Sequence, residues 1–216
     1  MKKHIYDVFA DRWYRNNGSV YIYSDPHFSD EEANYLRKKY IGDEEQVKRI
    51  NSKVGKNDTI IFLGDIGNTE YIKKIRGYKV LIMGNHDSGA SNYKKYFEKP
   101  HPSHIFDSIL TKTREETNSN LFDEVYEGPL VISEKVILSH EPVDLPYFIN
   151  LHGHTHNLPH RYDDRHINCV AEAINYTPVS LKNILESGVL KNIDSIHRLT
   201  IDTATERKRK KNSIKG

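Results

Sequence analysis

The chain has 216 residues, of which 37% are hydrophobic and 29% charged, a composition typical of a soluble globular protein with one sizeable core. No apolar run approaches the length of a membrane-spanning helix, and the first residues lack the apolar stretch of a signal peptide. The single cysteine, Cys169, excludes an internal disulfide framework and suits a reducing compartment. We therefore expect a cytoplasmic protein that does not bind membranes.

The net charge of +2 is unevenly distributed along the chain. Six Lys and Arg side chains lie in residues 207–216, which leaves a net charge of −4 for residues 1–206. Such a tail can contact a nucleic acid or another polyanion, although basic chain ends are more often solvated and disordered. We assign residues 201–216 to a basic tail, for which we expect disorder, and residues 1–19 to an N-terminal lead-in.

The first 87 residues alternate between strand and helix patterns. Three short apolar runs predict strands buried on both faces, at residues 20–23, 59–63 and 80–83. Three segments between them predict helices, at residues 31–40, 43–53 and 71–75. This alternation favours a parallel sheet with crossover helices.

The pattern changes after the third predicted strand. Residues 88–122 are rich in Ser, Asn, Lys and Pro, and we expect them to form loops and short helices that cap a site. Three strands in quick succession, at residues 123–126, 130–133 and 136–138, predict a second, partly antiparallel sheet. Further strands are expected at 148–151 and 167–170, and a late helix begins at Ser180, a plausible N-cap. No linker divides residues 20–200, which we take as one domain.

Polar side chains follow five of the predicted strands, at the points where these strands end: Asp25 and His27; Asp65; Asn85, His86 and Asp87; His140; and His154 and His156. Ligands of open α/β sheets bind beyond the carboxyl ends of strands, so these side chains predict one shared site. Taken singly, the aspartates could cap helices, and Asn85 and Asp87 could simply form a turn.

The residue types in this set indicate metal chemistry. Leaving out His86 and Asp87, the set offers two carboxylates, one amide oxygen and four imidazoles, which is more than one divalent ion uses. Two ions that share a bridging carboxylate would use them all. The mixture of oxygen and nitrogen ligands without a thiolate suits Mn, Fe, Zn or Co better than Ca or Mg alone.

With these motifs, the chain resembles the calcineurin-like metallophosphoesterase superfamily, in particular its small prokaryotic and phage members. Five blocks carry the resemblance, in the family's order and within residues 20–185: Asp25-Pro-His27, Gly64-Asp65, Gly84-Asn85-His86-Asp87, Ser139-His140 and Gly153-His154-Thr155-His156. The resemblance implies an α/β fold, a four-layer α/β/β/α sandwich of two mixed sheets flanked by helices.

The resemblance also implies a role for each residue. The first metal would be held by Asp25, His27 and His156, the second by Asn85, His140 and His154, and Asp65 would bridge them. His86 would protonate the leaving oxygen, and Asp87 would either orient His86 or only close the turn. The implied reaction is hydrolysis of a phosphodiester or phosphomonoester by in-line attack of a metal-bridging hydroxide. Two divalent ions are implied, with manganese the leading candidate and Fe, Zn, Ni or Co as alternatives.

The substrate stays open at this point, between a phosphorylated small molecule and a nucleotide or nucleic acid, as does the oligomeric state. His152 alternates with His154 and His156 and could complete a three-His zinc site, but we favour a structural role for it. One alternative function is a catalytically silent interaction scaffold of the same fold. Another is a nuclease or phosphodiesterase that uses the basic tail.

Overall fold

The computed structural model describes residues 12–87, 121–194 and 203–207. The predicted cap region, apart from residues 121–122, lies outside the described residues. The same is true of most of the predicted basic tail, although residues 203–207 are described and are helical. The disorder expected for the tail therefore stays a prediction. Among the described residues, no helix is both long and apolar enough to cross a membrane.

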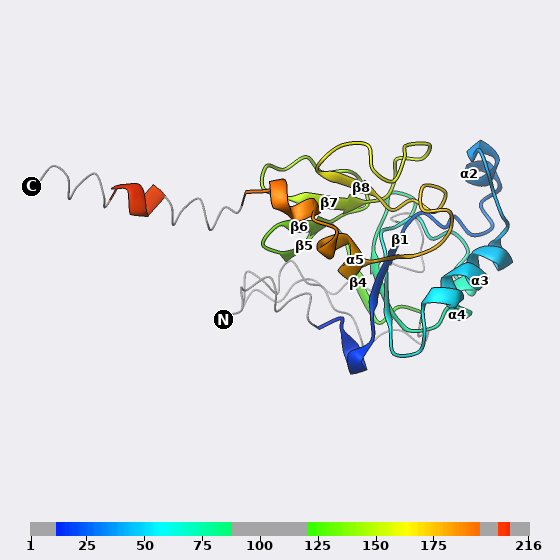
Figure 1. The fold of residues 1–216 in the computed structure, drawn as a ribbon. Helices are drawn as coiled ribbons and strands as arrows, with labels where there is room; N and C mark the ends of the chain where they lie inside the picture. Colours follow the sequence, from blue (N-terminus) through cyan, green and yellow to red (C-terminus); the bar gives the residue numbers. More distant parts are fainter. Residues whose placement is uncertain (1–11, 88–120, 195–202, 208–216) are drawn as a thin grey trace, which may run out of the picture.

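Two mixed β-sheets form the centre of the molecule (Figure 1). The first has the strand order β4-β3-β2-β1-β9, in which β9 is antiparallel to β1 and the other neighbours are parallel. Its strands are β1 (Val20–Tyr23), β2 (Thr59–Phe62), β3 (Tyr78–Ile82), β4 (Glu124–Tyr126) and β9 (Val179–Ser180). The second sheet has the order β5-β6-β7-β8, with only β5 and β6 antiparallel. Its strands are β5 (Leu130–Ser133), β6 (Val136–Leu138), β7 (Ile149–His152) and β8 (His166–Asn168).

Helices flank these sheets, which confirms the predicted fold class. The α-helices are α2 (Glu31–Leu36), α3 (Asp43–Lys53), α4 (Glu70–Lys73) and α5 (Leu181–Glu186), and the 3₁₀ helices are η1 (Arg15–Asn17) and η3 (Val189–Asn192). Helices α3 and α4 lie on one side of the first sheet, where Val47, Ile50 and Ile72 join an apolar cluster with residues of β1, β2 and β3 (Figure 1). Ser180 caps α5 as predicted, since its hydroxyl accepts a hydrogen bond from the Asn183 N–H.

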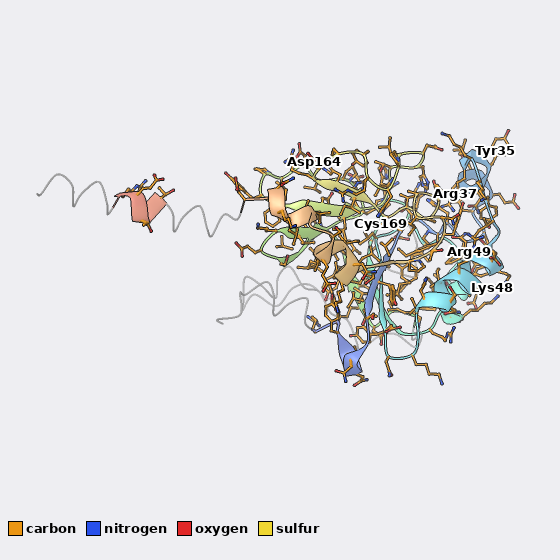
Figure 2. All side chains as sticks on the ribbon, viewed as in Figure 1. Tyr35, Arg37, Lys48, Arg49, Asp164 and Cys169 are labelled. Carbon is orange, nitrogen blue, oxygen red and sulfur yellow. The ribbon has the colours of Figure 1, made fainter. Side chains whose placement is uncertain are left out.

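A second apolar cluster fills the space between the two sheets. It combines Ile22 and Val80 of the first sheet with Leu138 and Leu151 of the second, and all four are fully buried. Burying such side chains supplies most of the favourable free energy of folding. Cys169 belongs to the same cluster (Figure 2), and burial raises the pKa of its thiol, as expected for an unreactive cysteine.

Two predicted elements differ in the structure. The segment 123–126 was expected in the second sheet, but as β4 it pairs in parallel with β3 and extends the first. The chain crosses between the sheets only afterwards, through Gly128-Pro129, so the short spacing to β5 does not mark a hairpin. Helix α2 ends at Leu36 instead of residue 40. The backbone of Arg37 is extended, because its guanidinium turns inward to the main-chain carbonyls of Asp25 and Pro26.

The N-terminal lead-in is anchored to the first sheet through Glu124. Trp13 is fully buried, and its indole N–H donates a hydrogen bond to this carboxylate at 3.1 Å. Arg12, Tyr78 and Tyr126 also donate to Glu124. Burial opposes ionisation of Glu124, but these four donors outweigh it and hold the pKa of Glu124 below its usual range.

Candidate metal centre

All the strand ends identified in the sequence meet at one place, where β1, β2 and β3 of the first sheet face β6 and β7 of the second. Backbone conformation here is unusual. Asp25, His27, Asp65 and His154 have φ values of 52°, 44°, 52° and 64°, in the left-handed region that non-glycine residues seldom adopt. Strain of this kind persists when the surrounding structure enforces it, and it gathers at functional sites.

The first predicted ligand set is brought together. One ligand atom from each of Asp25, His27 and His156 lies within 4.8 Å of the others. The Oδ1 atom of Asp25 is 3.5 Å from His156 Nε2 and 3.9 Å from His27 Nε2. This Oδ1 atom is buried and has no hydrogen-bond partner among the residues that the structure describes. A buried carboxylate oxygen without a donor is costly, whereas a cation among these three atoms would satisfy it.

The second set is equally compact. One ligand atom from each of Asp65, His140 and His154 lies within 4.8 Å of the others. His140 Nδ1 lies 2.7 Å from the Leu63 carbonyl oxygen, and donating to it leaves Nε2 of His140 with a free lone pair. That nitrogen is 2.8 Å from the amide oxygen of Asn85, which is 3.1 Å from His154 Nδ1. In the tautomer that donates from Nδ1, His140 Nε2 and the Asn85 oxygen are both acceptors, and a cation between them would relieve their repulsion.

Asp65 lies between the two sets. Its Oδ2 atom is 3.6 Å from His27 Nε2 in the first set and 3.4 Å from His140 Nε2 in the second. Its Oδ1 atom accepts a hydrogen bond from the main-chain N–H of His86 at 3.0 Å. A single carboxylate therefore borders both sets, as the predicted bridging role requires.

At two glycines, Gly84 and Gly153, the backbone lies directly against the carboxylates of the two ligand sets. A Cβ atom on Gly84 would overlap Asp65 Oδ1 and crowd the His140 ring, and one on Gly153 would overlap Ser24 Oγ and Asp25 Oδ2. Only glycine fits where the backbone lies against a carboxylate. Several features of the site fit a pair of divalent ions: the carboxylate and imidazole ligand atoms, the Asp25 oxygen described above, and the close backbone approach at Gly84 and Gly153.

Comparison with known proteins agrees with this geometry. A family model described as calcineurin-like phosphoesterase matches residues 18–181. The protein belongs to this family. In the solved structure of AQ665, a protein of unknown function from Aquifex aeolicus, 99% of the chain aligns with 79% of this one, at 22% identity and a TM-score of 0.55, so the two share a fold. The nuclease MPE of Pseudomonas putida aligns over 62% of this chain and 60% of its own, at 20% identity and a TM-score of 0.38. No curated protein matches the chain.

None of the five sequence motifs contains the acids that contact Nδ1 of the histidines of the first ligand set. Glu172 Oε1 is 2.5 Å from His156 Nδ1, and Asp30 Oδ2 is 3.0 Å from His27 Nδ1. Such carboxylates fix the ring orientation and the tautomer of metal-binding histidines. Asp30 also caps α2, because its carboxylate accepts a hydrogen bond from the Ala33 N–H. Glu172 lies in a turn after β8, where no sequence motif marks it.

The two first-set histidines respond differently to their surroundings. Burial opposes protonation of His156, but the hydrogen bond with Glu172 and the charge of Asp25 outweigh it and raise the pKa of His156. For His27 burial prevails and lowers the pKa. His27 therefore offers its metal-facing nitrogen as a neutral ligand over a wider pH range.

Arg37 contacts residues on both sides of the first ligand set. Its side chain is 1% exposed. The guanidinium donates to the main-chain carbonyls of Asp25 and Pro26, and its Nε lies 3.6 Å from Glu172 Oε2. Arg37 thus links the loop after β1 to the carboxylate that holds His156.

Of the two predicted catalytic residues, only His86 lies at the opening of the site. Its side chain is exposed, and its ring centroid is 5.4 Å from that of His27. Asp87 is buried and uses both carboxylate oxygens on the main-chain N–H groups of Gly84, Asp65 and Ile66. These contacts match the turn-closing alternative for Asp87, and none of them reaches the His86 ring.

His152 belongs to neither ligand set, which agrees with the structural role that the sequence analysis favours for it. Its Nδ1 is 2.8 Å from the Gly153 carbonyl oxygen and its Nε2 is 2.9 Å from the Tyr162 hydroxyl. Burial lowers the pKa of His152 to about 4. Both ring nitrogens are occupied by protein partners, so the three-His zinc site is not formed.

Proposed function

We propose that this protein hydrolyses phosphate esters with two divalent ions held by the seven predicted ligands. The observation that carries the proposal is the pair of compact ligand sets bordered by Asp65, with a buried Asp25 oxygen that finds no donor among the described residues. Family membership supports the reaction class, because the matched model describes phosphoesterases.

The ions would supply Lewis acidity toward a phosphoryl oxygen and an activated water as nucleophile. The protein's own contribution is positioning. Asp65 borders both ligand sets, and Asp87 fixes the Asp65 backbone through its N–H. The exposed side chain of His86 lines a cleft beside the two ligand sets, together with His27 and His156. From there its imidazole can donate a proton to the departing ester oxygen.

Manganese is our leading candidate for the ion, with Fe, Zn, Ni or Co as alternatives. Nitrogen and carboxylate donors without a thiolate support this group. The substrate class is a phosphodiester or phosphomonoester of a small molecule or nucleotide, and we place the reaction in the cytoplasm. A catalytically silent scaffold is the competing proposal, but the compact ligand sets give it no support.

The test compares three proteins: wild type, His86→Ala and Asp65→Asn. Each is stripped of metal and assayed on a generic phosphodiester and a generic phosphomonoester, with Mn, Fe, Zn, Ni, Co and Mg added separately. We expect wild type to bind two ions per chain and to turn over one ester class. His86→Ala should keep both ions but lose about 10²–10⁴-fold in rate, the usual contribution of a general acid.

Asp65→Asn should lose both ion binding and turnover, because the bridging charge is gone. No stoichiometric metal on the wild-type protein would refute the enzymatic function and favour the scaffold. Equal turnover by wild type and His86→Ala would leave the metal centre standing and remove His86 from the mechanism.

A further inference from the structure

Helix α2 has an unusual distribution of apolar side chains. None of its residues Glu31–Leu36 is buried, and its two large apolar side chains are mostly in solvent, with Tyr35 88% exposed and Leu36 69% exposed. Tyr35 lies at the outer edge of the molecule (Figure 2). A single exposed leucine is ordinary on a protein surface, but Leu36 also lines the cleft beside the candidate metal centre, where an apolar side chain can contact a ligand.

The helix is nevertheless fixed firmly to the metal centre. Asp30 caps α2 and contacts the His27 ring, and the Asn34 side chain donates to the His27 carbonyl. Arg37, which follows the helix, holds the carbonyls of Asp25 and Pro26. A segment with no core contacts is thus held in place by the residues that position metal ligands.

A cleft of about 350 Å³ lies between this helix and the metal centre. His27, His86 and His156 line one side, and Ala33 and Leu36 of α2 line the other. Tyr35 does not line it. The volume is at the lower end for small-molecule sites, which suits one phosphoryl group and one ring-sized organic group.

The charges around the cleft argue against a second phosphate. Asp30 and Glu32 add acidic groups to its lining. Among the described lining residues the only Lys or Arg is Arg37, whose side chain is 1% exposed and already engaged with main-chain carbonyls. A site for nucleic acid needs free cations along the phosphate backbone, which this side of the cleft does not offer.

From these contacts we infer that α2 forms the subsite for the organic group of the substrate, with Leu36 and Ala33 contacting an uncharged, ring-sized apolar group. This inference rests on the proposed function, because the metal centre must hold the phosphoryl group. The substrate is then a small ester of an apolar alcohol or phenol, and a polynucleotide is disfavoured.

The test measures binding by calorimetry, so it does not depend on turnover. The probes are methylphosphonate and phenylphosphonate, which share a phosphonate head and differ only in the organic group. Manganese-loaded wild type should bind phenylphosphonate about tenfold more tightly than methylphosphonate, the size expected when one ring face leaves water. Leu36→Ala should weaken phenylphosphonate binding about fivefold and leave methylphosphonate binding unchanged.

Tyr35→Ala is the matched control, since it removes a larger exposed apolar side chain from the same helix outside the cleft. It should change neither affinity. Equal binding of the two phosphonates by wild type would overturn the inference, as would equal losses in Leu36→Ala and Tyr35→Ala. If neither phosphonate binds the protein loaded in turn with Mn, Fe, Zn, Ni and Co, the proposed function itself fails.

A charge-reversed variant tests the polynucleotide directly. A single-stranded oligodeoxynucleotide should displace phenylphosphonate poorly from wild type and better from Glu32→Lys, which adds a cation to the cleft. Displacement competition excludes binding to the basic tail from the readout. An oligodeoxynucleotide that displaces phenylphosphonate from wild type at a lower concentration than methylphosphonate does would overturn the inference and identify a nucleic-acid substrate.

Discussion

Replacing Glu172 by glutamine should weaken metal binding at the first ligand set and leave the second set unchanged. The carboxylate lies 2.5 Å from His156 Nδ1 in a setting where its own side chain is 13% exposed and that of His156 is 29% exposed. Hydrogen bonds to charged groups contribute about 1.5–3 kcal/mol, and glutamine keeps a neutral acceptor, so roughly half of this is lost. Half of this range is about 0.75–1.5 kcal/mol, and because both side chains are only partly exposed we expect a net loss of about 1 kcal/mol.

A loss of this size corresponds to about fivefold weaker affinity, slightly below what substitutions behind metal-binding histidines usually cause. Calorimetric titration of the metal-free protein measures it. The His154→Ala background removes a ligand from the second set, so that the first set can be titrated alone. Glu70→Gln is the control, because the exposed Glu70 side chain of α4 forms an ion pair with Lys73 and with no other residue that the structure describes.

The reasoning about Glu172 would be wrong if Glu172→Gln bound the first ion with wild-type affinity. It would also be wrong if affinity fell equally in Glu172→Gln and Glu70→Gln, since that loss would report only the change in net charge.

Three further substitutions test other parts of the structure. Gly153→Ala places a methyl group against the Asp25 carboxylate, so it should abolish binding of the first ion and lower the melting temperature, both measurable on one sample. Glu124→Gln tests the pH dependence of stability. The folded pKa of Glu124 lies below its unfolded value, so the ionised form stabilises the protein above about pH 4.3, and this contribution is lost as the pH falls through the folded pKa. Denaturant unfolding should show wild type ahead by about 1–3 kcal/mol at pH 7 and by less at pH 3. Asp87→Asn loses hydrogen bonds from main-chain N–H groups, so it should lower the free energy of unfolding by about 1–3 kcal/mol. The rate per metal-loaded molecule should stay within a fewfold of wild type. A rate as low as that of His86→Ala would instead show that Asp87 orients the catalytic imidazole.

The sequence predicts the ligands because they follow a local rule. Each one lies within a few residues of the end of a strand whose apolar run is visible in the sequence, and the parallel arrangement brings those ends together. The same patterns place β1 to the residue, and β2 and β3 to within two residues at each end. It fails for β4, because the choice between pairing with β3 and turning back toward β5 depends on which edge needs a partner.

Residues that act through long-range contacts could not be found in this way. Glu172 and Arg37 lie far from each other in sequence and in no motif, and only folding puts them 3.6 Å apart behind the metal-facing histidines. Asp87 shows the opposite case, since its motif suggested catalysis while its contacts are all to backbone N–H groups. The sequence motif therefore identifies candidate residues, and the hydrogen bonds of each residue in the folded protein indicate its role.

The position of the two ligand sets has a consequence for the fold itself. Each set takes residues from both sheets: the first joins Asp25 and His27 after β1 to His156 after β7, and the second joins Asp65 after β2 to His140 after β6. Without ions, the buried carboxylates and imidazoles at this junction are imperfectly paired, as the Asp25 oxygen shows. Ions bound here would therefore act as cross-links between the sheets and stabilise the fold in proportion to their affinity. If the proposed ions bind here, the alignment of the two sheets and the geometry of the candidate site would depend on the same few bonds, and the close backbone approach at Gly84 and Gly153 brings the two ligand sets within reach of those bonds.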